Sequence, residues 1–158
     1  MRKLTEGSEQ IVTPGDPNDA YKDLTMIGQG ASGSVYLATE VATGNKVAVK
    51  QIIVAKQVNK QVIVNEVSLM KQCQHPSIVQ FLDSYLLNGT LWVAMELIDG
   101  EDLTQVIAAS KVTEKQIAYI TRETLAGLGH LHEKEIVHRD IKSDNVMVAM
   151  DGRVKISE

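Results

Sequence analysis

The sequence predicts an α+β protein in two parts, an antiparallel sheet of five strands with one helix followed by a mainly helical region. Apolar and polar side chains alternate along residues 21–53, which is the pattern of half-buried strands. The period changes to that of a helix over residues 57–73. We expect the boundary between the two parts near Asp99-Gly100.

The first twenty residues lack this periodicity. They contain the turn formers Pro14, Gly15, Asp16 and Pro17 and few side chains to bury. We therefore expect residues 1–20 to be a flexible leader. The folded parts are then residues 21–98 and residues 99–158.

The elements of the first part follow from local patterns. Val35, Leu37 and Thr39 share one face of a strand, and after a turn at residues 42–45 a second β-rich stretch covers residues 46–52. In the helix, Val62, Glu66 and Leu69 fall at i, i+4 and i+7. Two further strands are predicted over residues 78–86 and 91–97. The Asn88-Gly89 dipeptide between them is a strong hairpin signal.

The second part is dominated by a helix over residues 114–134. Thr113 and Gln116 have the spacing of a capping box at its start, and Gly127 and Gly129 are expected to weaken it. Its apolar stripe comprises Ile117, Ile120, Leu128 and Leu131. A short strand over residues 146–149 and another ending at Ile156 flank the Asp151-Gly152 turn.

The composition of the 158 residues excludes several classes of protein. The chain is 44% apolar and 23% charged, as in soluble globular proteins, and its net charge of −4 argues against a nucleic-acid partner. A single cysteine, Cys73, allows no internal disulfide. No apolar run approaches the roughly 18–20 residues that span a bilayer. We expect a cytoplasmic protein without a membrane span.

The first candidate functional motif is the glycine-rich stretch from Gly28 through Gly30 and Gly33 to Val35. In a dinucleotide-binding loop the last glycine opens directly into a helix, whereas the residues after Gly33 alternate as in a strand. The alternative is a hairpin tip whose backbone N–H groups approach phosphates because no Cβ intervenes. An ordinary glycine turn explains the same residues.

The second candidate is Lys50, which shares one face of a strand with the small residue Ala48. Such a face suits a flat ring with a phosphate tail, although a strand lysine is usually solvated. Glu66 lies between Val62 and Leu69 on the apolar side of the predicted helix, where a carboxylate needs a partner. Lys50 is a suitable one, and the alternative is that Glu66 reaches water.

The third candidate is the eight-residue stretch from His138 to Asn145. Asp140 can accept the proton of a hydroxyl, Lys142 can neutralise a transferring phosphoryl group, and Asn145 offers an oxygen ligand for Mg²⁺. A polar surface turn is the alternative, because Asp, Ser and Asn are turn formers. Metal binding by His130 and His132 is not expected, since residues two apart on a helix face different ways.

Together these motifs resemble the N-terminal part of a eukaryotic protein kinase domain, from about Tyr21 to the end of the chain. The sequence most resembles that of the PAK family, which are serine/threonine kinases activated by Rho-type GTPases. The resemblance implies a five-stranded N-lobe sheet with one helix and the start of a helical C-lobe. Lys142 after Asp140 is typical of serine/threonine kinases rather than tyrosine kinases.

The resemblance also implies site residues. Asp140 would be the catalytic base, assisted by Lys142 and Lys50, and Asn145 would bind Mg²⁺. Glu66 would be the partner of Lys50, and Met95 would be the gatekeeper. The ATP site would comprise Ile27, Gly28, Gln29, Gly30, Ala31, Ser32, Gly33, Val35, Ala48, Lys50, Glu66, Met95, Glu96, Ile98 and Met147.

The implied function is transfer of a phosphoryl group from MgATP to the Ser or Thr hydroxyls of proteins. The chain departs from the family where an Asp-Phe-Gly motif is expected, because Glu158 stands at the place of its aspartate, the main metal ligand. We therefore expect an incomplete catalytic domain. A Rho-type GTPase would act through a segment outside this chain. The alternative is a short isoform or pseudokinase that binds a nucleotide or a partner without catalysis.

Overall fold

The computed structural model describes residues 12–30, 33–54 and 60–157, apart from the side chains of residues 60–64 and 66. The chain divides into two compact units. The first contains the residues up to Gln72 together with Phe81–Leu97, and the second contains Cys73–Gln80 and the chain from Ile98 onward.

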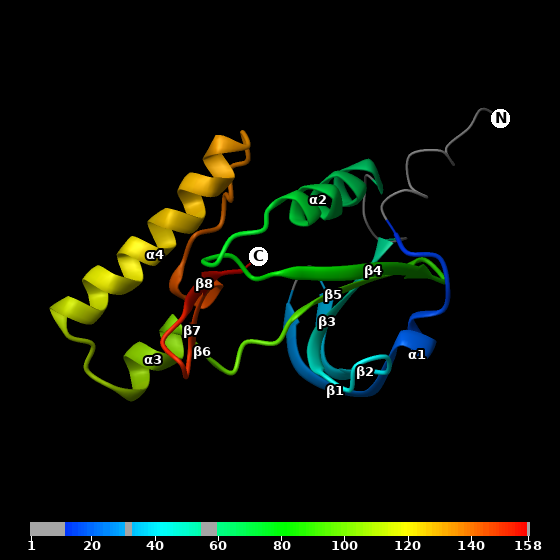
Figure 1. Ribbon diagram of the computed structural model, residues 1–158, viewed down its shortest axis with the longest axis horizontal. Coiled ribbons are helices and arrows are strands. Elements are labelled where there is room, and N and C mark those ends of the chain that lie inside the picture. Colours follow the sequence, from blue (N-terminus) through cyan, green and yellow to red (C-terminus); the bar gives the residue numbers. More distant parts are fainter. Residues whose placement is uncertain (1–11, 31–32, 55–59, 158) are drawn as a thin grey trace. The chain divides into compact units, whose positions relative to one another are not determined.

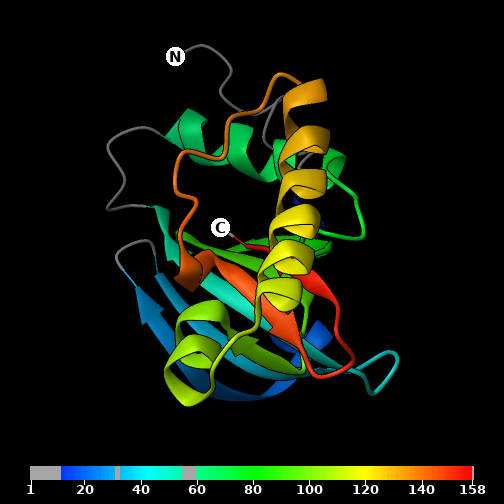
Figure 2. The same cartoon turned by 90° about the vertical axis from the view of Figure 1, so that its left-hand side faces the viewer.

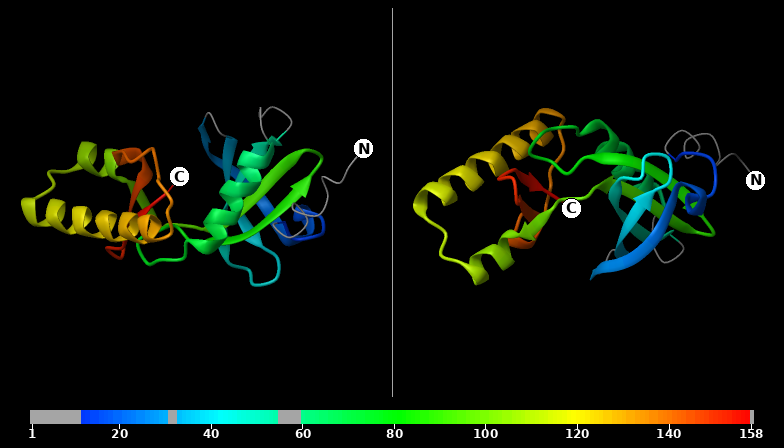
Figure 3. Two further views of the ribbon diagram at one scale, coloured as in Figure 1. Left: turned by 90° about the horizontal axis from the view of Figure 1, so that it is seen from above. Right: turned by 60° about the horizontal axis from the view of Figure 1, so that its bottom comes forward.

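The first unit is an antiparallel five-stranded sheet with the order β1-β2-β3-β5-β4 (Figure 1). Its strands are β1 (Tyr21–Gly30), β2 (Gly33–Glu40), β3 (Lys46–Ile53), β4 (Phe81–Leu87) and β5 (Thr90–Glu96). The helix α2 (Lys60–Gln72) contacts β4, over which it passes in the left view of Figure 3. The predicted five-stranded sheet with one helix is confirmed.

The two faces of this sheet carry separate apolar clusters. Side chains directly opposite each other on paired strands share a face, so Val49 and Ala94 lie on one side and Ile52 and Leu91 on the other. The first face packs a cluster that comprises Tyr21, Ala38, Val47, Val49, Trp92 and Ala94. Side chains of the second face and of α2 form a cluster that comprises Ile52, Val67, Phe81, Leu91 and Val93.

The chain before the sheet has defined structure from Val12 onward, although the sequence predicts a flexible leader. The short helix α1 (Pro17–Ala20) is capped by Asp16, whose carboxylate accepts a hydrogen bond from the N–H of Asn18. Pro17 is fully buried. Pro17 can be buried here because proline at the first position of a helix loses no hydrogen bond, whereas Pro14, Gly15 and Asp16 are exposed.

The second unit combines two helices with a small sheet (Figure 2). The helices are α3 (Leu103–Ala109) and α4 (Glu114–Glu133), and the 3₁₀ turn η2 (Ser143–Asn145) precedes β7. The sheet has the order β6-β7-β8, formed by β6 (Gly100–Asp102), β7 (Val146–Ala149) and β8 (Val154–Ile156). Its apolar core comprises Cys73, Ile120, Leu131, Val146, Val154 and Ile156.

The helix α4 begins as predicted with a capping box. Thr113 accepts a hydrogen bond from the N–H of Gln116, and the side chain of Gln116 accepts one from the N–H of Thr113. The predicted stripe is buried in part: Ile120 and Leu131 lie in the core, whereas Ile117 is 53% exposed. Among the described residues, no helix is long and apolar enough to cross a bilayer.

Besides α1, three elements differ from the sequence prediction. The strand predicted from residue 78 begins at Phe81, because Ile78 instead forms an isolated bridge with Ile156 in the second unit. The prediction also lacks β6 and α3. The helix α3 has only seven residues and is held at its start by Asp102, which accepts from the N–H of Gln105.

Candidate functional site

The first group of predicted site residues lies on one face of the sheet. Lys50 is opposite Val35 on β2 and Val93 on β5, while Ala48 is opposite Leu37 and Met95. The helix α2 covers part of this face, since its buried residue Val67 packs in the same cluster as Val93. The strand alternation therefore brings Val35, Ala48, Lys50 and Met95 to a common surface.

The partner predicted for Lys50 is outside what the structure describes. Glu66 belongs to the described backbone of α2, but its side chain is not among the described groups. The ion pair between Lys50 and Glu66 consequently stays a prediction.

The glycine-rich stretch is a hairpin of two strands. Gly28 is opposite Val35, and Gly30 at the end of β1 is opposite Gly33 at the start of β2. Ala31 and Ser32 at the tip lie outside the described residues. Because a strand follows Gly33, the dinucleotide-binding alternative is excluded.

The three glycines of this hairpin lie in different surroundings, so the absence of a side chain has a different consequence at each. Gly33 has a φ of +149°, and a Cβ on it would lie 2.2 Å from the carbonyl oxygen of Gln51 in β3. A Cβ on Gly30 would meet no atom within 4 Å, and on Gly28 only the Cβ of Val35 at 3.9 Å. Gly33 thus serves the close approach of β2 to β3, whereas the backbone at Gly28 and Gly30 is open to a ligand.

The other residues predicted for the ATP site occupy strands in both units. Ile27 is 54% exposed in β1, Gln29 of the same strand is opposite Ser34, and Glu96 ends β5. Ile98 opens the last segment of the second unit. In that unit Met147 lies in the middle strand β7, opposite Asp102 on one side and Lys155 on the other.

The second group of predicted residues meets in the loop between α4 and β7. One carboxylate oxygen of Asp140, Oδ2, lies 3.0 Å from Nζ of Lys142 and accepts a hydrogen bond of 2.9 Å from Nδ2 of Asn145. Nδ2 of Asn145 also donates to the carbonyl oxygen of Asp140 at 2.8 Å. The structure therefore brings the side chains of Asp140, Lys142 and Asn145 together within a compact loop of six residues.

The backbone on both sides fixes this loop. Nδ1 of His138 accepts from the N–H of Asp140 at 3.3 Å, and Nε2 of His138 lies 3.1 Å from the carbonyl oxygen of Ser157. The N–H of Ser157 donates to the carbonyl oxygen of Asn145 at 2.9 Å. The chain is thus held next to the loop up to Ser157, while Glu158, which stands at the place of the family's main metal ligand, lies outside the described residues.

The motif-based prediction missed one residue that contacts this loop from another element. The hydroxyl of Thr104 in α3 donates to Oγ of Ser143 at 2.7 Å and ties the loop to a helix 39 residues away in the sequence. Two hydroxyl residues so far apart give no sequence signal, because a threonine in the first turn of a helix is equally common without such a contact.

The electrostatics of the loop favour an ionised carboxylate. The hydrogen bond from Lys142 lowers the pKa of Asp140, and the Asn145 amide and the charges of Lys142 and His138 lower it further. In return Asp140 raises the pKa of Lys142. Asp140 therefore stays a hydrogen-bond acceptor and Lys142 a cation at neutral pH.

The donor set of Asn145 fits a divalent cation. Within the described part of the chain, the side chain of Asn145 makes two hydrogen bonds and both use Nδ2, so the amide oxygen is the group available to a metal. Amide and carboxylate oxygens are the ligands that Mg²⁺ prefers. In the described part of the chain no three His, Cys, Asp or Glu side chains form a cluster able to hold a metal by themselves.

The sheet with a glycine hairpin and a strand lysine, together with the His-Arg-Asp loop, defines the class of the protein. The protein kinase domain family matches residues 21–158, and the chain belongs to this family. Its members use ATP and a divalent metal in general.

The relatives identify the branch of the family. The chain is 50% identical over 157 residues to the serine/threonine-protein kinase STE20 of Eremothecium gossypii, 52% over 149 residues to CST20 of Candida albicans, and 48% over 150 residues to MST20 of Pyricularia oryzae. These matches cover 99%, 94% and 95% of the chain, but only 16%, 12% and 16% of the relatives. The predicted resemblance to PAK-like serine/threonine kinases is confirmed.

Proposed function

We propose that this chain is the nucleotide-binding and loop-bearing part of a serine/threonine protein kinase that transfers the γ-phosphoryl group of MgATP to protein hydroxyls. The observation that carries the proposal is the convergence of Lys142 and Asn145 on one oxygen of Asp140. Under this proposal, one loop would supply a base, a cation and an oxygen ligand for the metal.

In this proposal each residue of the loop has one task. Asp140 orients the substrate hydroxyl and accepts its proton, for which its lowered pKa keeps it ionised. Lys142 neutralises charge on the phosphoryl group as it transfers. Asn145 holds Mg²⁺ through its amide oxygen, and the metal supplies charge neutralisation when bound.

The first unit would bind the nucleotide. Lys50 would contact the α- and β-phosphates, with Glu66 as its partner. The open backbone at Gly28 and Gly30 would approach the phosphates. The remaining residues proposed to line the ATP site are Ile27, Gln29, Ala31, Ser32, Gly33, Val35, Ala48, Met95, Glu96, Ile98 and Met147.

The likeness to the relatives supports three further parts of the proposal. The substrates are proteins with Ser or Thr hydroxyls, the location is the cytoplasm, and a Rho-type GTPase regulates the kinase through a segment outside residues 1–158. The chain spans 16% or less of the length of these relatives, so the activity of a whole protein is proposed by analogy.

An Asp140→Asn variant tests the assignment of the base. We expect it to lower phosphoryl transfer from γ-labelled ATP to a Ser/Thr-containing protein by roughly 10²- to 10⁴-fold. MgATP affinity, measured by calorimetry, should stay within about twofold, since asparagine keeps the shape of the side chain. Transfer at the wild-type rate by this variant would contradict the proposal.

The same assay separates catalysis from binding alone. A wild-type chain that binds MgATP but transfers no phosphoryl group would favour the alternative of a nucleotide-binding or partner-binding module. A Glu158→Asp variant then restores the residue type that the family has at this position, and a gain of transfer would assign the defect to Glu158.

A further inference from the structure

Residues Val12–Ala20, called the clasp below, wrap around the outer edge of the sheet at β4. Val12 packs against the apolar cluster on the α2 side of the sheet, and Ala20 packs against the cluster on the opposite side. Figure 1 shows this dark-blue stretch passing the end of β4 to reach α1. The clasp thus covers a sheet edge whose unpaired N–H and C=O groups would otherwise be open to other chains.

Thr13 fastens the clasp to β4. Its N–H donates to the carbonyl oxygen of Ser84 at 2.7 Å, and its hydroxyl donates to Oδ1 of Asp83. Asp83 is held in place in turn, because its Oδ1 accepts from the N–H of Ser84 at 2.8 Å and its Oδ2 accepts from the hydroxyl of Tyr85 at 3.0 Å. Thr13 therefore joins a fixed carboxylate.

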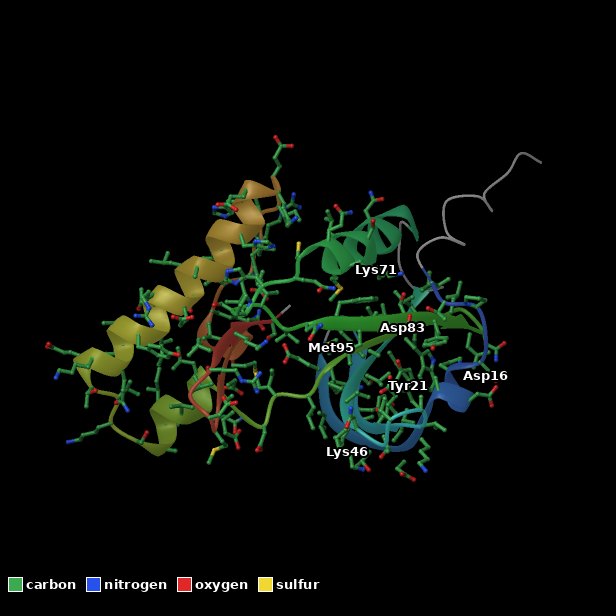
Figure 4. The ribbon with its side chains drawn as sticks, viewed as in Figure 1. Asp16, Tyr21, Lys46, Lys71, Asp83 and Met95 are labelled. Carbon is green, nitrogen blue, oxygen red and sulfur yellow. The ribbon has the colours of Figure 1, made fainter. Side chains whose placement is uncertain are left out.

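The surroundings of this contact are electronegative. Burial raises the pKa of Tyr21, and Tyr85, Asp83 and Glu40 raise it further. Asp16, labelled in Figure 4, lies on the clasp itself and caps α1. Among the described residues, no lysine or arginine forms an ion pair with Asp83. A second negative group placed at Thr13 would be repelled by the carboxylate of Asp83.

We propose that Thr13 is a phosphorylation site for a proline-directed kinase and that its phosphorylation opens the clasp. Pro14, which follows Thr13 directly, is the residue that kinases of this class read, and it is exposed. The Thr13 Oγ attacks the γ-phosphorus of ATP held by that kinase, the bond from this phosphorus to the β,γ-bridging oxygen breaks, ADP leaves, and the hydroxyl proton passes to the kinase's base. The phosphorylated side chain has no hydroxyl proton to donate to Asp83, and its negative charge is repelled by that carboxylate.

Opening would expose the edge of β4 and loosen the start of β1. The rings of Tyr21 and Tyr85 meet edge to face with centroids 5.9 Å apart, and the carbonyl oxygen of Ala20 accepts from the N–H of Val41. Because β1 carries the glycine hairpin at its other end, phosphorylation at Thr13 would lower the stability of the unit that holds Lys50.

The first test is modification of the intact chain. The Asp140→Asn chain, which cannot modify itself under the proposed function, is incubated with ATP and a purified MAP-kinase-type enzyme. We expect phosphate at Thr13 by mass spectrometry and its loss in a Pro14→Ala variant. No phosphate at Thr13, or phosphate that does not depend on Pro14, overturns the proposal.

The second test is the charge effect on the clasp. We expect Thr13→Glu to speed hydrogen exchange at the amide of residue 13 by roughly tenfold or more, since the hydrogen bond to Ser84 is lost. Thr25→Glu, at an exposed position of β1, should leave this amide unchanged. Adding Asp83→Asn to Thr13→Glu should recover much of the protection.

Two results would refute the mechanism even if Thr13 is phosphorylated. One is unchanged protection of the residue 13 amide after phosphorylation. The other is strictly additive behaviour of Thr13→Glu and Asp83→Asn, because repulsion between the two sites requires coupling.

Discussion

The carboxylate of Asp140 holds two neighbouring side chains at a single oxygen, Oδ2. Asp140 and Lys142 are both exposed, so their attraction is screened by water and adds little to the stability of the fold. Its effect is local: the pair and the Asn145 amide hold three side chains together, and they favour the ionised form of the Asp140 carboxylate. The pair therefore fixes the geometry of the loop more than it stabilises the fold.

The influence of Lys142 on Asp140 can be measured directly. Because Lys142 lowers the pKa of Asp140, the carboxylate stays ionised to a lower pH than a free aspartate and protonates only as the pH falls through that lowered pKa. We expect Lys142→Met to raise the pKa of Asp140 toward its ordinary value in a ¹³C NMR titration. Asp151, which pairs with Arg153, is the internal control, and its pKa should be the same in the Lys142→Met variant as in the wild type. An unchanged Asp140 titration would contradict the pairing.

The glycines of the hairpin give a second prediction at this scale. We expect Gly33→Ala to cost on the order of 3 kcal/mol of unfolding free energy, because the added Cβ would meet the Gln51 carbonyl in a strained conformation. Gly30→Ala should cost far less, since a Cβ there meets no atom within 4 Å. Urea denaturation of both variants measures the two losses of unfolding free energy. Equal losses would contradict the different roles assigned to Gly33 and Gly30.

Residues close in sequence were the predictable part of the site. Asp140, Lys142 and Asn145 fall within six residues, so any compact loop brings them together. The contact between Thr13 and Asp83 joins residues 70 apart, and that between Thr104 and Ser143 joins residues 39 apart. Such contacts depend on how elements pack, which no local pattern encodes.

At the scale of elements, α4 shows why a glycine inside a helix is not always a weakness. A Cβ on Gly127 would lie 2.8 Å from the carbonyl oxygen of Ser77 and 3.1 Å from Cδ1 of Ile156. Gly127 lets the segment 73–80 approach the helix, where the Ser77 hydroxyl also donates to Glu123 at 3.1 Å. Gly127 lowers the helix propensity of α4, but it allows the close packing of residues 73–80 against the helix.

The two glycines of α4 should respond oppositely to alanine. Gly129→Ala should stabilise the chain by up to about 1 kcal/mol, since a Cβ there meets nothing within 4 Å and alanine favours the helix. Gly127→Ala should destabilise it, because the Ser77 carbonyl must move. Thermal unfolding followed at 222 nm tests both, and stabilisation by both substitutions would contradict the packing of the segment on α4.

The elements that the sequence predicted share strong local signals. Period, capping box and the Asn88-Gly89 turn identify α4 and the β4–β5 hairpin. The elements α1, α3 and β6 are short, with four, seven and three residues, and too few turns or pairs for a period to appear. They exist because capping residues and packing partners hold them.

At the scale of the whole molecule, each unit has its own apolar core, and the second unit also exposes apolar residues on its helices. Leu125 is 61% exposed and Ile107 is 55% exposed. A groove of about 640 Å³ between α3 and α4 is lined by a largely apolar set that comprises Leu103, Ile107, Val112, Ile117 and Ile120. Surfaces of this kind promote association.

We expect this chain to bind the hydrophobic dye ANS and to self-associate. Ile107→Lys with Ile117→Lys should reduce the fluorescence of bound ANS, because both residues line the groove. Ile53→Lys, at a residue 46% exposed in the first unit, is the matched control and should have little effect. A chain that stays monomeric and does not bind ANS would contradict this expectation.

Calorimetric titration of the chain with ATP and Mg²⁺ tests most directly the proposal that Lys50 binds the phosphates of MgATP. We predict saturable binding that Lys50→Met weakens about tenfold or more, since a charged hydrogen-bond partner of the phosphates is removed. Lys22→Met, which removes an exposed lysine of β1, should bind as the wild type does. Equal affinity of the Lys50→Met and wild-type chains would contradict the claim.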